Sequence, residues 1–134
     1  MDSRALELWW FLPVGYLFTV ALETPVLLFG LSPHHSPRRK FLSGLWLTAC
    51  TYPIVVLVLP LLFRSSSQFA YLVTAETFAP VAECALFRAA FGGRAETGRA
   101  AVAWRDFAAI TAANLASFAL GEVLNAYRWF GVLG

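Results

Sequence analysis

The chain has 134 residues, of which 59% are hydrophobic and only 13% are charged, and its formal net charge is +2. A soluble domain carries about a quarter charged residues, so this composition excludes an ordinary water-soluble protein. The hydrophobic residues fall in four long blocks. They predict an all-α, polytopic membrane protein, a bundle of four transmembrane helices in a single domain over residues 1–134.

The first span is expected over about residues 8–31, and it opens with the aromatic residues Trp9 and Trp10, which favour a membrane–water interface. It is too long for the apolar region of a signal peptide, and no small-residue cleavage site follows it, so we expect it to be retained. A polar, proline-containing loop leads to the second span, about residues 41–63.

The third span is expected over about residues 69–91 and the fourth over about residues 104–129, with a glycine- and arginine-containing loop between them. Helices of this length rise ~35 Å, enough to cross a hydrocarbon core of ~30 Å with some tilt. Phe18 and Glu23 lie 60 positions before Phe78 and Glu83. These two matches at one spacing are compatible with a duplicated helical hairpin, and the alternative is that they agree by chance.

The basic residues are distributed unevenly. Seven of the ten lie in or beside the first and third loops: Arg38, Arg39, Lys40, Arg88, Arg94, Arg99 and Arg105. The other side holds Arg4, Arg64 and Arg128. The positive-inside rule therefore predicts that the first and third loops face the cytoplasm and that both termini lie outside.

Four carboxylates lie deep inside the spans: Glu23, Glu76, Glu83 and Glu122. A charged group at mid-membrane costs at least ~2.5 kcal/mol, so each is expected to face the bundle interior and to find a partner there.

Depths counted from the cytoplasmic side place these groups in two layers. The inner layer holds Glu23, Glu83 and Asn114, with Thr51 in support. The outer layer holds Glu76 and Glu122, with Asn125 in support. Such a ladder of polar groups can relay protons or coordinate cations. The structural alternative is that the glutamates only join helices by bonding to Asn114, Thr51 or freed carbonyl groups.

Other groups suggest chemistry less specifically. Cys50 and Cys84 would suit a soft metal ion, although small apolar packing residues are the simpler interpretation. His34 and His35 would bind a metal or sense pH, but solvated loop residues are the expectation. The basic first loop would contact anionic lipid headgroups, or serve topology alone. We expect no cofactor, no catalytic residue set and no nucleic-acid surface.

Small residues on the fourth span favour a close helix contact, within the chain or between protomers, with Ser117 and Gly121 as the small-xxx-small pair.

Three motifs carry a family resemblance: Thr51-Tyr52-Pro53 with Pro60, Ala75-Glu76-Thr77-Phe78-Ala79 with Glu83, and Asn114-Leu115-Ala116-Ser117-Phe118 with Gly121. They resemble small four-span bacterial membrane proteins, mostly uncharacterised. The resemblance covers about two thirds of the chain. It implies the four-span fold and supports the choice of Glu76, Glu83 and Asn114, and it implies no activity. The expected location is a bacterial inner membrane.

The leading hypothesis is a small transporter or channel for a cation or protons that uses these carboxylates, acting with membrane lipid and as a homo-oligomer or with a membrane-protein partner. One alternative is a non-catalytic subunit or anchor that docks another membrane protein. Another is a membrane-embedded enzyme acting on lipid.

Overall fold

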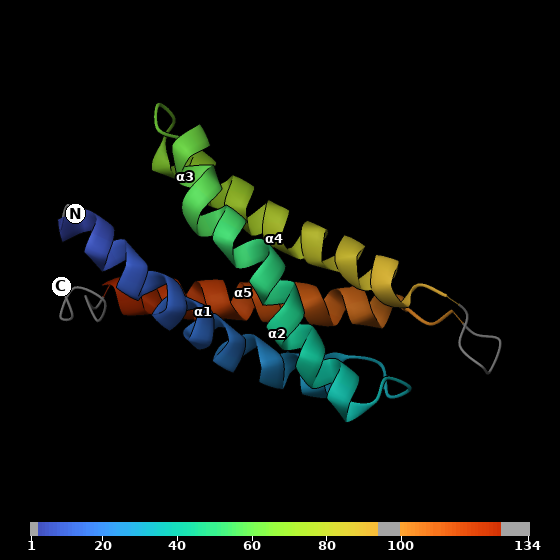
Figure 1. Cartoon of the computed structure of the whole chain (residues 1–134). Coiled ribbons are helices and arrows are strands. Elements are labelled where there is room, and N and C mark those ends of the chain that lie inside the picture. The colour runs from blue at the N-terminus through green and yellow to red at the C-terminus, as the bar shows by residue number, and fades with distance from the viewer. Residues whose placement is uncertain (1–2, 94–99, 127–134) are drawn as a thin grey trace.

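The computed structural model describes residues 3–93 and 100–126, with side chains described for residues 9–93 and 100–124. Within these ranges every regular element is helical: α1 (Ser3–Gly30), α2 (Pro37–Pro53), η1 (Ile54–Val58), α3 (Leu59–Leu62), α4 (Gln68–Phe91) and α5 (Trp104–Ala126) (Figure 1). Four stretches are long and apolar enough to cross a membrane: Trp9–Gly30, Pro37–Leu62, Gln68–Phe91 and Trp104–Leu124. The predicted all-α bundle of four membrane-spanning helices is therefore confirmed.

Local sequence explains where two of the helices begin. Ser36 precedes α2, and its hydroxyl oxygen accepts a hydrogen bond from the Arg39 amide, with Pro37 in the first turn. Ser67 caps α4 in the same way through the Ala70 amide. A capping serine satisfies one of the amides that a first helical turn leaves without an intrahelical partner.

Two prolines interrupt the second span. Pro53 and Pro60 have no amide hydrogen, and between them the chain widens into the π-helical turn η1. The carbonyl oxygen of Val55 in this turn accepts a hydrogen bond of 3.1 Å from the Tyr71 hydroxyl of α4. The proline pair is therefore accommodated by a side chain from the neighbouring helix.

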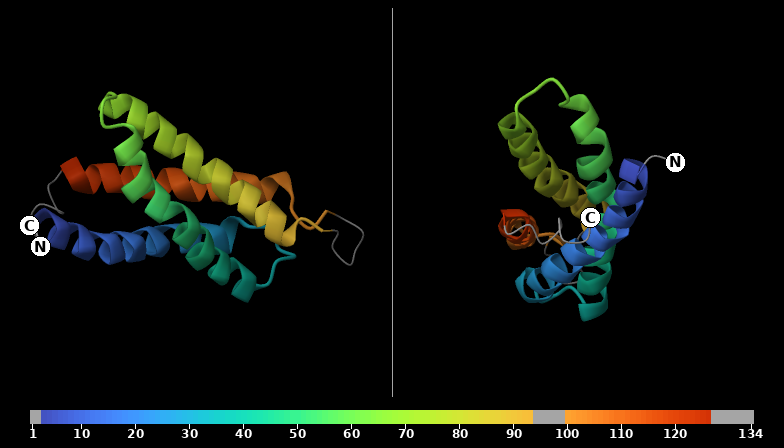
Figure 2. Two further views of the ribbon diagram at one scale, coloured as in Figure 1. Left: turned by 45° about the horizontal axis from the view of Figure 1, so that its top comes forward. Right: turned by 90° about the vertical axis from the view of Figure 1, so that its left-hand side faces the viewer.

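The helices pack together at one end of the bundle and diverge at the other (Figures 1 and 2). The loop end contains residues 31–36, 92–93 and 100–103. The terminal end contains the start of α1, the α3–α4 connection and the last turns of α5. At the terminal end the tip of the hairpin formed by α3 and α4 stands away from α1 and α5.

The apolar core lies in the half of the bundle nearer the loop end. Its buried members come from all four spans: Leu27, Leu31, Leu47, Phe87, Ala109, Ile110 and Ala113. In lipid no hydrophobic force draws helices together, so association depends on close packing and on polar contacts between helices. The interlocked side chains therefore close the bundle at this end.

Gly44 allows α1 and α2 to approach closely, and this predicts a large response to one added methyl group. A Cβ at Gly44 would overlap the Thr24 side chain and lie 3.3 Å from the Thr24 Cα, whereas a Cβ at Gly121 would meet nothing within 4 Å. Gly44→Ala should destabilise the protein by about 1–3 kcal/mol because the two helices must separate. Thermal unfolding in detergent measures the effect, and Gly121→Ala is the matched control. Equal stability of the two variants would contradict the packing described.

Gly121 itself does not mediate a close contact within the described part of the chain, since its surroundings are open. The other member of the small-residue pair, Ser117, contacts α1 through a polar bond rather than through close backbone packing.

Candidate functional site

Glu23 is buried in α1 and is held by two hydroxyl groups from two other helices. Its Oε2 accepts a hydrogen bond of 2.9 Å from Thr48 Oγ1 of α2, and its Oε1 accepts one of 2.7 Å from Ser117 Oγ of α5. Only 3% of its surface is exposed. The first helix is thereby joined to both of its neighbours at one carboxylate.

Glu83 occupies the equivalent place in α4. Its Oε1 accepts a hydrogen bond of 2.6 Å from Thr51 Oγ1 of α2, and its Oε2 accepts one of 2.7 Å from Asn114 Nδ2 of α5. Its exposed fraction is 2%. The structure brings Glu83, Asn114 and Thr51 of the expected inner layer into direct contact.

The two glutamates use neighbouring donors on the same two helices. Thr48 and Thr51 are three residues apart on α2, and Asn114 and Ser117 are three residues apart on α5, so each pair shares one helix face. Each glutamate lies on the first helix of its hairpin and receives one bond from α2 and one from α5. This pairing matches what a duplicated hairpin would produce.

All four intramembrane glutamates line one cavity of about 250 Å³ between α1, α2, α4 and α5: Glu23, Glu76, Glu83 and Glu122. Thr48, Thr51, Asn114 and Ser117 line it as well. Among the described residues that form its wall, none is a lysine, arginine or histidine. The wall therefore offers carboxylates without a fixed positive charge to neutralise them.

The three threonine and serine hydroxyl groups that donate to Glu23 and Glu83 each have a second acceptor within reach. Thr48 Oγ1 lies 2.8 Å from the Gly44 carbonyl oxygen, Thr51 Oγ1 lies 3.1 Å from that of Leu47, and Ser117 Oγ lies 3.0 Å from that of Asn114. A hydroxyl has one proton, so it donates either to the carboxylate or to the carbonyl. In the second arrangement its oxygen is free to accept a hydrogen bond from the O–H of a neutral carboxyl group. The same side chains can therefore satisfy a glutamate in either protonation state.

The outer-layer glutamates are less enclosed. Glu76 is half-buried and Glu122 is exposed, yet both lie on the wall of the same cavity as the inner pair. The side chain of Asn125, expected in support of this layer, lies outside the described residues.

The cysteines do not gather with the glutamates into a metal site. Cys50 and Cys84 are free thiols, and the Cys84 thiol lies 3.8 Å from the Phe107 carbonyl oxygen. Over the described side chains, neither cysteine belongs to a cluster of three ligand-bearing residues.

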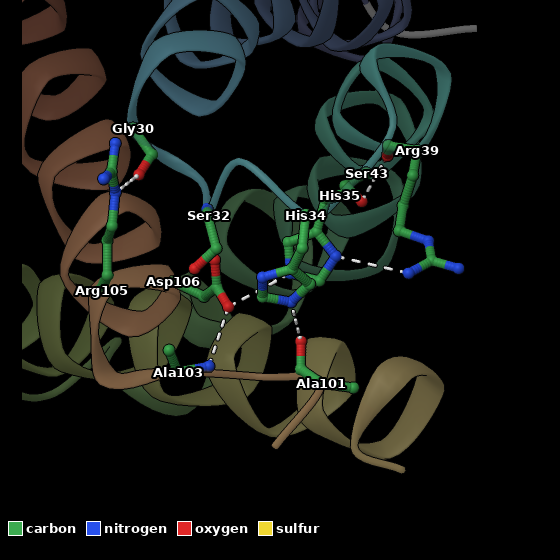
Figure 3. Close-up of polar contacts among 10 residues, drawn as sticks. All are labelled: Gly30, Ser32, His34, His35, Arg39, Ser43, Ala101, Ala103, Arg105 and Asp106. Carbon is green, nitrogen blue, oxygen red and sulfur yellow. Dashed lines mark hydrogen bonds and ion pairs between the residues drawn. The ribbon is translucent and has the colours of Figure 1, made fainter. Parts of the chain in front are cut away.

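A second buried polar group, here termed the loop latch, joins Ser32, His35, Ala103 and Asp106 at the loop end (Figure 3). Asp106 Oδ1 accepts a hydrogen bond of 2.7 Å from the Ser32 amide. Its Oδ2 accepts one of 2.9 Å from the Ala103 amide and one of 3.1 Å from His35 Nε2. One fully buried carboxylate therefore fixes the first loop to the start of α5.

The expectation that His35 is a solvated loop residue was wrong. Its side chain is fully enclosed, in edge contact with the Phe87 ring at 5.3 Å and bonded to Asp106. Burial lowers the pKa of His35 below its ordinary value, opposed by the bond to Asp106. His34 is exposed, as expected, and contacts the Ala101 carbonyl oxygen.

The loop latch fits a hydrogen-bonded clamp better than a metal centre. His34, His35 and Asp106 each place one ligand atom within 4.8 Å of the others. However, Arg39 Nη1 lies 3.3 Å from His35 Nδ1, and a guanidinium group can only donate. His35 Nδ1 must then be the acceptor, and the proton of the neutral ring lies on Nε2, facing Asp106. This assignment leaves His35 no lone pair for a metal ion.

The sequence did not single out Thr48 or Ser117 as partners of Glu23, nor Asp106 as a buried anchor. A partial signal existed for Asp106, because an acidic residue in the first turn of a helix commonly bonds back to the amide that precedes the helix. No comparable signal exists for Thr48 and Ser117.

Comparison with models of known families gives no match, and neither the curated proteins nor the solved structures yield one. The resemblance to small four-span bacterial membrane proteins therefore stays a prediction.

Proposed function

We propose that this protein carries a cation or protons across a bacterial inner membrane through the cavity lined by its four intramembrane glutamates. The observation that carries the proposal is this single cavity, in which Glu23 and Glu83 are buried and no basic residue of the described wall faces them. Carboxylates placed in a membrane need protons or cations to neutralise them, which makes such a cavity suited to positively charged cargo.

The hydroxyl groups around the inner pair support exchange of that cargo. Because Thr48, Thr51 and Ser117 each reach a carboxylate and a main-chain carbonyl, loss or gain of a proton leaves no buried donor without an acceptor. A carboxylate held in this way can change its protonation or its bound cation without the helices moving apart.

The two ends of the bundle differ in a way that would let ions reach the glutamate cavity from one side of the membrane only. The apolar core and the loop latch close the loop end, while the cavity lies toward the spread terminal end. With the basic loop end in the cytoplasm, the cavity would face the outside in this conformation. Transport then requires the loop end to open in turn, within a homo-oligomer or with a membrane-protein partner.

The test is ion flux in liposomes that contain only this protein. Purified protein is reconstituted with a pH-sensitive dye inside, and gradients of protons and of monovalent and divalent cations are imposed one at a time. We expect protein-dependent flux for protons or for one class of cation, above that of empty liposomes. Protein that moves none of them across several lipid compositions would defeat the proposal and favour the anchor or partner-subunit function.

A further inference from the structure

A second cavity, of about 300 Å³, lies at the loop end of α2 and shares no lining residue with the glutamate cavity. Its wall is formed by Ser36, Arg38, Arg39, Leu42, Ser43, Trp46 and Phe91. The proposed transport function uses none of these residues.

The cavity wall changes from cationic to apolar along one face of α2. Arg39, Leu42, Ser43 and Trp46 follow the spacing of a single helix face, and Arg39 and Trp46 are separated by a rise of ~10 Å. Leu42 is 47% exposed and Trp46 is 38% exposed. An amphipathic ligand with a charged head and an apolar chain fits this gradient.

The cationic part of the wall lacks an acidic partner. Within the described residues, the one contact between acidic and basic side chains is His35–Asp106, and no acidic residue lines the cavity. Each guanidinium group has five N–H donors. Among the described side chains, the one hydrogen bond that either guanidinium group makes is that of Arg39 Nη1 with His35. Most of the donors of Arg38 and Arg39 therefore remain for an anion, and guanidinium groups recognise phosphate with paired donors.

The position of Arg39 is fixed by buried groups behind it (Figure 3). Its guanidinium carbon lies 4.6 Å from the centre of the Phe91 ring, and Nη1 donates to His35 Nδ1. His35 is in turn held by the fully buried Asp106. The loop latch thus places one arginine at the cavity wall before any ligand arrives, which reduces the entropy lost on binding.

We propose that this cavity binds an anionic phospholipid of the cytoplasmic leaflet, with the headgroup phosphate on Arg38 and Arg39 and an acyl chain along Leu42 and Trp46. A free phosphate ion shares the headgroup chemistry. The lipid is favoured because the wall runs ~10 Å along α2 from Arg39 to Trp46, so that its apolar part lies at the depth of the acyl chains, where a soluble anion would leave it uncovered.

The experiment uses quenching of tryptophan fluorescence by phospholipid with brominated acyl chains. The full chain is reconstituted in phosphatidylcholine vesicles with increasing brominated phosphatidylglycerol, and the contribution of Trp46 is obtained by difference from Trp46→Phe. We expect saturable quenching of Trp46 by phosphatidylglycerol, and weaker quenching by brominated phosphatidylcholine. Arg38→Gln, which leaves the loop latch untouched, should raise the half-saturating fraction about fivefold, and Arg39→Gln at least as much.

The matched control is Arg88→Gln, which removes the same charge near the same end of the bundle but from outside this cavity. A local site predicts little change for Arg88→Gln, so an equal loss in all three variants would show diffuse attraction and overturn the proposal. Competition by millimolar inorganic phosphate would assign the site to a soluble anion and overturn it as well. Equal quenching by both brominated lipids would also refute it, whatever the flux assay shows.

Discussion

Glu83→Gln should abolish transport while leaving the protein folded and inserted. The Gln oxygen can accept from Asn114 Nδ2, and its amide can donate to Thr51 Oγ1, whose own proton turns to the Leu47 carbonyl 3.1 Å away. Every hydrogen bond is thereby kept, but the group can no longer bind or release a proton or offer a negative charge. Flux in liposomes should fall to the level of empty vesicles, and the thermal unfolding midpoint should stay near that of the wild type.

Thr77→Val is the matched control on the same helix. Thr77 is exposed, bonds to the carbonyl of Val73 in its own helix and does not line the cavity, so its replacement should leave flux unchanged. If Glu83→Gln transports as fast as the wild type, the buried carboxylates serve only to join helices, and the function would have to lie elsewhere.

Asp106→Asn should be the most destabilising conservative substitution in the described chain. Both carboxylate oxygens accept N–H bonds, from the Ser32 amide on one side and from Ala103 and His35 on the other. In either orientation the new amide group would point an N–H toward one of these donors. A buried donor left without an acceptor costs about 1–3 kcal/mol, so we expect a loss of roughly 2–4 kcal/mol in the free energy of unfolding.

Thermal unfolding in detergent measures this loss, with Glu122→Gln as the control because that carboxylate is exposed. An Asp106→Asn protein as stable as the control would show that the loop latch does not hold the loop end together.

The same network gives a dependence on pH. Because the pKa of His35 is lowered in the folded protein, the unfolded chain takes up this proton first as the pH falls. The stability that His35 contributes is therefore fully present above about pH 6.5 and is lost as the pH drops below that value. The difference in unfolding midpoint between the wild type and His35→Gln should shrink from pH 7.5 to pH 5.5. A difference that grows on acidification would contradict this assignment.

Properties that run along the helix axis could be read from the amino-acid sequence. The four spans follow from the lengths of the hydrophobic blocks, since a helix rises ~1.5 Å per residue and each block is long enough to cross the hydrocarbon core. The same counting placed Glu83, Asn114 and Thr51 at one depth, and the structure joins these three side chains by hydrogen bonds.

Properties that depend on how each helix is rotated about its own axis could not be read from the amino-acid sequence. Thr48 and Ser117 bond Glu23 because α1, α2 and α5 meet there, and hydrophobic content alone does not say which side of an apolar helix faces which neighbour. His35 illustrates the same limit in a loop. Its sequence surroundings are polar, but the fold places a buried carboxylate from α5, 71 residues away, against its ring. Depth was therefore determined by the sequence, and the lateral partners were decided by tertiary packing, because contacts between distant segments depend on helix rotation and loop path together.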